Sequence, residues 1–182
     1  MKLKRALIFS ITLILIATTL LVTVLLIYSP LRYRAKIYSD CNEWIDPAFL
    51  EANKVKGANY NNPAYDETQA WTEENPKYYR DQTAPSTRTY VITDEDTFHS
   101  IYGEGTLEVD FEKEMVLLHL FSSGYPRREY RMKKLELKGD ALNIHYKMES
   151  NGNRKDYSLP KVKCLTVKMK KLDVSTVAFT EL

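Results

Sequence analysis

The chain has 182 residues, 44% of them hydrophobic and 27% charged, with a formal net charge of +2. This length fits one globular unit with an appendage, and this composition excludes collagen-like, low-complexity and wholly disordered chains. Two cysteines are too few for a disulfide-dense scaffold or a four-thiolate zinc site, and the small net charge argues against a nucleic-acid partner.

The first predicted element is a membrane-spanning helix over residues 6–28. These 23 residues carry no charge, and as a helix they would extend about 35 Å, against about 30 Å for the hydrocarbon core of a bilayer. The run is longer than the apolar region of a secretory signal peptide, and Ser29-Pro30-Leu31-Arg32 follows it in place of a small-x-small cleavage pattern. We therefore expect that the first segment of the chain, residues 1–36, contains a retained single-pass anchor. Residues 6–28 of this segment are expected to contact the lipid bilayer.

The orientation of this anchor does not follow from basic residues, because three precede the span and three follow it. Large domains after a first span are exported with little regard to their charge. We expect location in the cell membrane, with the amino terminus inside and the domain outside.

Charge is segregated along the rest of the chain. Residues 37–111 carry 5 basic and 15 acidic side chains, whereas residues 112–182 carry 15 basic and 9 acidic ones. Either the two halves pack together and neutralise one another, or a basic face is presented to an acidic partner or to anionic lipid headgroups.

Residues 37–88 form an acidic, aromatic-rich segment that contains both tryptophans, Trp44 and Trp71. Disordered linkers are poor in aromatic residues, so we expect this segment to pack on the domain that follows. Within it, Asp46 and Pro47 predict the N-cap and first position of a short helix, and Asn59 to Tyr65 has the composition of a surface loop. The alternative is that its aromatic residues form a recognition arm.

Residues 89–182 are predicted to form the regular domain. A strand at Thr89–Ile92 leads into a short helix capped by Thr93, and Met115–Phe121 reads as a central strand covered on both faces. A hairpin follows, with a β-bulge near Lys133-Lys134 and clean alternation from Leu142 to Met148. Strands around residues 165–169 and 177–179 complete an α+β, strand-dominated fold of about six antiparallel strands, a sheet or small sandwich with one or two short helices.

Catalytic motifs are not found: the nucleophile elbow, H-E-x-x-H, C-x-x-C, Walker and dinucleotide patterns are all missing from the sequence. We expect no enzyme activity and no cofactor. His119 and His145 could be neighbours across the sheet, which is a weak zinc signal beside the ordinary reading of exposed or core-edge histidines. A thiol nucleophile at Cys164 beside His145 is equally weak.

The two cysteines have a structural use if the domain lies outside the cell. A disulfide between Cys41 and Cys164 would close a long loop and stabilise the fold by about 3 to 5 kcal/mol in the loop-entropy model. Two free buried thiols are an equally good reading.

The stretch Asp110-Phe111-Glu112-Lys113-Glu114-Met115-Val116, the turn Gly124-Tyr125-Pro126 and the hairpin from Leu135 to Tyr146 resemble the carboxy-terminal domain of PrcB-type bacterial protease-complex subunits. The resemblance covers residues 89–182 and extends to membrane-anchored relatives of unknown function. It implies a noncatalytic domain that associates with or stabilises another exported protein, and it assigns no active-site residue.

Two functions from different classes follow. The first is a membrane-anchored, extracytoplasmic binding or scaffolding domain with an exported protein partner. The second is a small-ligand sensor or unrecognised hydrolase, with Tyr125, Arg127 and Arg128 around a pocket. These three residues are the predicted partner or ligand surface, although the two arginines would also suit a solvated entry to a strand.

Overall fold

The computed structural model describes residues 12, 14–19, 33–39, 41–125, 128–149 and 159–182. Most of the predicted span, residues 6–28, lies outside these ranges, and residues 12 and 14–19 are helical. None of the helices in the described ranges combines the length and hydrophobicity that a bilayer crossing requires.

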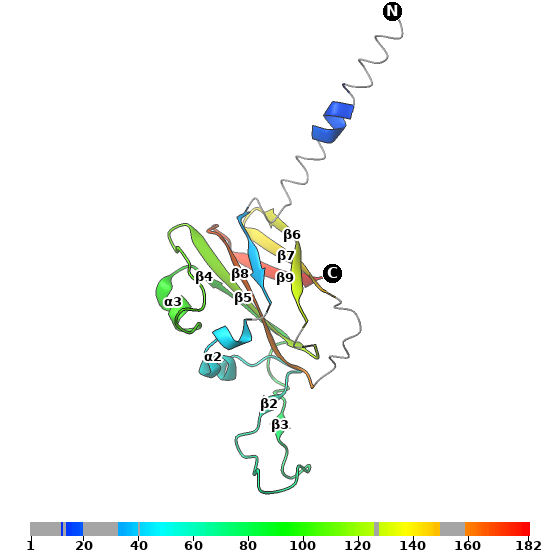
Figure 1. The fold of residues 1–182 in the computed structure, drawn as a ribbon, viewed down its shortest axis with the longest axis vertical. Helices are drawn as coiled ribbons and strands as arrows, with labels where there is room; N and C mark the ends of the chain where they lie inside the picture. The colour runs from blue at the N-terminus through cyan, green and yellow to red at the C-terminus, as the bar shows by residue number, and fades with distance from the viewer. Residues whose placement is uncertain (1–11, 13, 20–32, 40, 126–127, 150–158) are drawn as a thin grey trace, which may run out of the picture.

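The main sheet has four strands in the order β1-β8-β5-β4, and every neighbouring pair is antiparallel. Its strands are β1 (Lys36–Tyr38), β4 (Thr87–Ile92), β5 (Glu114–Ser123) and β8 (Lys161–Lys170) (Figure 1). The predicted strand-dominated class is confirmed. Strand β1 was not predicted from the sequence. It lies at the start of the domain and forms one edge of this sheet.

The second sheet has three strands, β6 (Tyr130–Lys138), β7 (Ala141–Met148) and β9 (Thr176–Glu181), in the order β6-β7-β9. The register of β6 against β7 shifts between Met132 and Lys134, which confirms the predicted bulge. Gly139 closes the hairpin with a φ of +62°, a conformation that glycine adopts without strain. The expectation that all strands are antiparallel was wrong at one place, because β9 runs parallel to β7.

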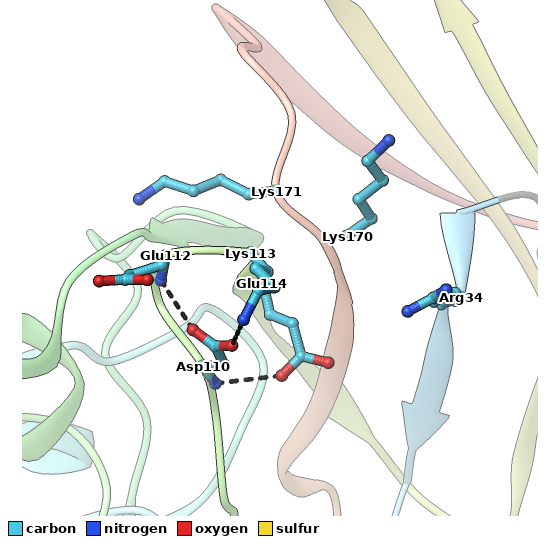
Figure 2. A pocket seen from close by; sticks show the side chains of 7 residues that line it. All are labelled: Arg34, Asp110, Glu112, Lys113, Glu114, Lys170 and Lys171. Carbon is cyan, nitrogen blue, oxygen red and sulfur yellow. Dashed lines mark hydrogen bonds and ion pairs between the residues drawn. The ribbon is translucent and has the colours of Figure 1, made fainter.

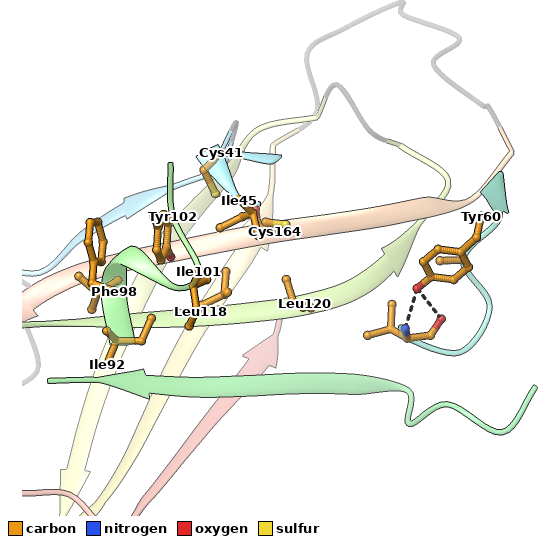
Figure 3. Close-up of a cluster of buried hydrophobic side chains, with 13 residues drawn as sticks. Cys41, Ile45, Tyr60, Ile92, Phe98, Ile101, Tyr102, Leu118, Leu120 and Cys164 are labelled. Carbon is orange, nitrogen blue, oxygen red and sulfur yellow. Dashed lines mark hydrogen bonds between the residues drawn. The ribbon is translucent and has the colours of Figure 1, made fainter. Parts of the chain in front are cut away.

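Strand β5 is buried on both faces, as its apolar run predicts. Met115 and Leu117 face the second sheet, together with Leu135, Ile144 and Val167. The alternate residues face the opposite way, into a cluster with Cys41, Ile92, Tyr102 and Cys164 (Figure 3). The main sheet is therefore the middle of three layers.

The third layer consists of short helices and the segment before β4. Its elements are η2 (Asn42–Trp44), α2 (Pro47–Ala52) and α3 (Glu95–His99). Asp46 caps α2 as predicted, accepting hydrogen bonds from the backbone N–H groups of Ala48 and Phe49. The cap of α3 is Asp94, which accepts from Thr97 N–H, so the prediction of Thr93 was wrong by one residue.

The aromatic-rich segment is part of the same core. Cys41, Ile45, Val55 and Ala58 are buried in the cluster that β5 and α3 share. Between residues 59 and 80 the chain leaves this layer and returns through a small hairpin, β2 (Tyr60–Asn61) paired with β3 (Tyr78–Tyr79). Figure 1 shows this hairpin and its loop projecting away from the three layers; we call residues 59–80 the hairpin arm.

Candidate functional site

The predicted surface at Tyr125, Arg127 and Arg128 forms a local turn where the structure describes it. Arg128 donates its backbone N–H to Tyr125 O, and the Arg128 guanidinium lies over the Tyr125 ring at 5.3 Å from its centroid. Residues 126 and 127 lie outside the described ranges. Neither Tyr125 nor Arg128 lines either of the two cavities described below.

The two histidines on strands lie on different faces. His119 is 3% exposed between the sheets, stacked on Phe179 with ring centroids 4.4 Å apart, and its Nδ1 lies 3.0 Å from Thr89 Oγ1. Burial lowers the pKa of His119 to about 4. His145 lies on the outer face of β7, where its Nε2 meets Glu136 Oε2 at 2.9 Å. The pairing of these imidazoles as a metal site is therefore wrong.

Hydrogen bonds from Lys134 and His145 lower the pKa of Glu136 to about 2. This group borders a cavity of about 170 Å³ on the outer face of the second sheet, lined by Glu136, Lys138, Ala141, Leu142, Asn143, Thr176 and Ala178. Within the described ranges, no group of three or more His, Cys, Asp or Glu side chains could hold a metal ion.

Cys41 and Cys164 are neighbours in the buried cluster of Figure 3, and both are free thiols. Cys41 Sγ donates to the backbone carbonyl of Cys164 at 3.3 Å and accepts from Thr166 Oγ1 at 3.1 Å. Burial raises the pKa of Cys164, and the nearby Cys41 adds to this effect. In the structure the two cysteines are therefore free thiols rather than a disulfide. The hypothesis of a Cys164 nucleophile beside His145 is wrong, because Cys164 and His145 lie in different layers.

The base of the hairpin arm is tied to the core by tyrosine and asparagine side chains. Tyr60 Oη accepts from Val55 N–H at 2.7 Å and lies 3.3 Å from Val55 O. The backbone N–H and the side-chain Nδ2 of Asn59 both donate to Pro160 O, at 2.8 and 2.7 Å. The arm therefore leaves the domain at the beginning of β8.

The distal loop of the arm is held by its own polar groups. Asn75 accepts from Asp66 N–H and donates to Asp66 O, both at 2.9 Å, which reproduces the pairing of a short ladder. The Asp66 carboxylate in turn accepts hydrogen bonds from Thr68 and from Gln69. These hydrogen bonds, those from Thr68 first, lower the pKa of Asp66. The loop has a defined shape without an apolar core of its own.

Trp71 is presented by this loop and is 62% exposed. Its ring meets Tyr78 edge-on with centroids 6.1 Å apart, and Lys77 Nζ lies 5.7 Å from the Tyr65 centroid. Residues 66–76 contain four acidic and no basic side chains. The result is a large exposed apolar ring that contacts Tyr78 on one side and belongs to an acidic stretch of the chain. Tryptophan is enriched among the residues that dominate binding at protein interfaces.

A second surface lies at the opposite end of β8. It is a cleft of about 700 Å³ that we call the basic cleft, lined by Arg34, Asp110, Glu112, Lys113, Glu114, Lys170 and Lys171 (Figure 2). The hydrogen bond from Lys113 lowers the pKa of Asp110. Strand β8 has 10 residues, so about 30 Å separates the cleft from the base of the hairpin arm.

No protein-family model, curated protein or solved structure matches the chain. The resemblance of residues 89–182 to the PrcB-type domain therefore stays a prediction, and the function has to be argued from the two surfaces. The aromatic residues of segment 37–88 were predicted to be a possible recognition element, and the hairpin arm is part of that segment. The cleft could not be predicted from the sequence, because Arg34 and Lys170 are brought together only by the pairing of β1 with β8.

Proposed function

We propose that the chain is a single-pass membrane protein whose extracytoplasmic domain binds or scaffolds another exported protein through the hairpin arm. The domain is noncatalytic in this proposal. The amino terminus is inside and residues 6–28 cross the bilayer. The resemblance to the PrcB-type domain supports the same reading.

The observation that carries the proposal is the exposed Trp71 on an ordered loop. Interface residues that dominate binding energy are enriched in tryptophan and are held in place before the partner arrives. The Asp66–Asn75 pairing supplies that order, and the Tyr78 ring limits the positions that Trp71 can take. The acidic side chains of the loop favour a partner with a basic rim around an apolar pocket.

Site-specific photocrosslinking in intact cells tests this proposal. A photoreactive phenylalanine derivative replaces Trp71 in the full chain, and irradiation should give one discrete adduct with an exported protein. The matched control carries the same group at Val91, which is also an exposed apolar residue, 40% exposed, but lies on β4. We expect no adduct of that size from the control.

Equal adducts from both positions would contradict the proposal, because they would indicate random collisions at the membrane surface. The absence of any adduct from the Trp71 position would contradict the proposal as well. The alternative of a small-ligand sensor at Tyr125, Arg127 and Arg128 has less support, because neither Tyr125 nor Arg128 lines either of the two described cavities and residue 127 lies outside the described ranges.

A further inference from the structure

We propose that the basic cleft binds the headgroup of an anionic phospholipid in the membrane that holds the anchor. The inference rests on the proposed membrane anchorage and adds a second contact between the domain and the bilayer. The chemical group that the cleft would bind is the phosphodiester of a lipid headgroup at the membrane surface.

Two of the three acidic side chains of the cleft, Asp110 and Glu114, are engaged by lysines, whereas the carboxylate of Glu112 has no hydrogen bond or ion pair within the described ranges. Asp110 Oδ2 accepts from Lys113 Nζ at 2.7 Å. Glu114 Oε2 pairs with Lys168 Nζ at 2.9 Å and also accepts from Asp110 N–H at 3.1 Å. Asp110 and Glu114 therefore neutralise Lys113 and Lys168, and the cleft keeps the other cations of its lining against the one carboxylate of Glu112.

Three cations remain. Lys171 Nζ is fixed by two backbone carbonyls, Thr93 O at 3.0 Å and Phe111 O at 2.8 Å, which orient the ammonium group but do not cancel its charge. The side chains of Arg34 and Lys170 make no hydrogen bond or ion pair with any other residue in the part of the chain that the structure describes. Figure 2 shows Arg34, two residues before β1, extending toward β8, with the Lys170 side chain on the Arg34 side of that strand and the Lys171 side chain pointing the other way, toward Glu112.

The position of the cleft selects the source of the phosphate. Arg34 lies six residues after Tyr28, the last residue of the predicted span. A chain of six residues spans at most about 20 Å, so the cleft lies within reach of the headgroup region when residues 6–28 cross the bilayer. Each lysine or arginine close to an anionic membrane contributes about a fivefold gain in binding.

The test measures lipid preference with the full chain. The protein is purified in a neutral detergent and titrated with dioleoylphosphatidylglycerol or dioleoylphosphatidylcholine, and bound lipid is counted by native mass spectrometry. We expect the anionic lipid to bind about tenfold more tightly than the zwitterionic one. The double variant Arg34→Gln with Lys170→Gln should lose most of that preference.

The matched control removes the same charge from the other end of the same strand. Arg80→Gln with Lys161→Gln changes two exposed cations at the base of the hairpin arm, so its lipid preference should equal that of the unmodified chain. Each variant is first checked for an unchanged thermal unfolding midpoint. Arg34→Gly with Lys170→Gln serves as a second cleft variant, since the φ of +50° at Arg34 suits glycine.

Equal loss of preference in the cleft and control variants would overturn the inference, because it would indicate a response to net charge alone. Competition by millimolar inorganic phosphate would overturn the lipid assignment in favour of a soluble anion. Carbonate extraction tests the proposed anchorage independently of lipid binding. A chain that leaves the membrane in carbonate refutes the anchorage, whereas a chain that is retained but shows no lipid preference refutes only the proposed lipid binding by the cleft.

Discussion

The hairpin arm and the basic cleft differ in what holds them in place. The arm is shaped by hydrogen bonds among its own side chains and backbone, with Asp66 and Asn75 at the centre. The cleft is formed where β8 ends and β1 and β5 begin, so its shape depends on the core between the sheets. A change in the core should therefore damage the cleft end of the molecule, and a change in the arm should stay local.

The largest effect is expected from a core truncation under the cleft. Leu117 is fully buried between the sheets, so Leu117→Ala should lower the free energy of unfolding by about 3 kcal/mol through lost burial and a cavity. Denaturant unfolding of the full chain in detergent measures this. Val91→Ala on the exposed side of β4 is the control and should cost less than about 1 kcal/mol; equal losses would mean that the core does not carry the fold.

Acid should weaken the core through His119. Its folded-state pKa of about 4 lies below the ordinary value of 6.5, so the unfolded state takes up the proton first. The stability that neutral His119 contributes is complete above pH 6.5 and is lost as the pH falls to about 4, a loss of roughly 3 kcal/mol.

His119→Phe keeps an aromatic ring against Phe179 and removes the titration. Unfolding curves measured between pH 7 and pH 4.5 should be flatter for this variant than for the unmodified chain. Parallel curves over that interval would show that His119 is not buried in its neutral form.

A change in the arm should act on the arm alone. Asn75→Ala removes both hydrogen bonds to Asp66 and should cost about 1 kcal/mol of local order. We expect faster proteolysis within residues 66–76 and a thermal midpoint that hardly changes. The exposed neighbour Glu74→Ala is the matched control; a large drop in the midpoint of Asn75→Ala would show that arm and core unfold together.

The smallest effect is expected at the edge of the cleft. Arg34 has a φ of +50°, a left-handed conformation that glycine adopts more easily than arginine. Arg34→Gly relieves the strain of this conformation but gives the unfolded chain more freedom, so the free energy of unfolding should change by less than about 1 kcal/mol. A loss well above that value, measured in denaturant, would mean that the guanidinium holds the fold rather than a ligand.

The strands after residue 87 could be predicted because their apolar residues follow a period of two or form a continuous run. The bulge at Lys133 was visible as a change of parity between Met132 and Leu135. The direction of β9 could not be predicted, since apolar and polar residues alternate in the same way in a parallel and in an antiparallel strand.

The elements before residue 87 were harder to predict because long-range contacts decide them. β1 has three residues with no repeating pattern, and its place is set by pairing with β8, far along the chain. The arm depends on side-chain hydrogen bonds such as Asn75 to Asp66, which hydrophobic patterns do not record. Its aromatic composition was the only signal, and it left packing and recognition as alternatives.

Both proposed surfaces depend on one orientation of the chain in the membrane, which cysteine labelling measures directly. Cys41 and Cys164 are buried, so a membrane-impermeant maleimide should leave the folded, unmodified chain unlabelled in intact cells. Glu104→Cys places a thiol on an exposed loop apart from the arm and the cleft, and Lys4→Cys places one before the anchor. We predict labelling of Glu104→Cys in intact cells and of Lys4→Cys only after permeabilisation. The reverse pattern would contradict the account.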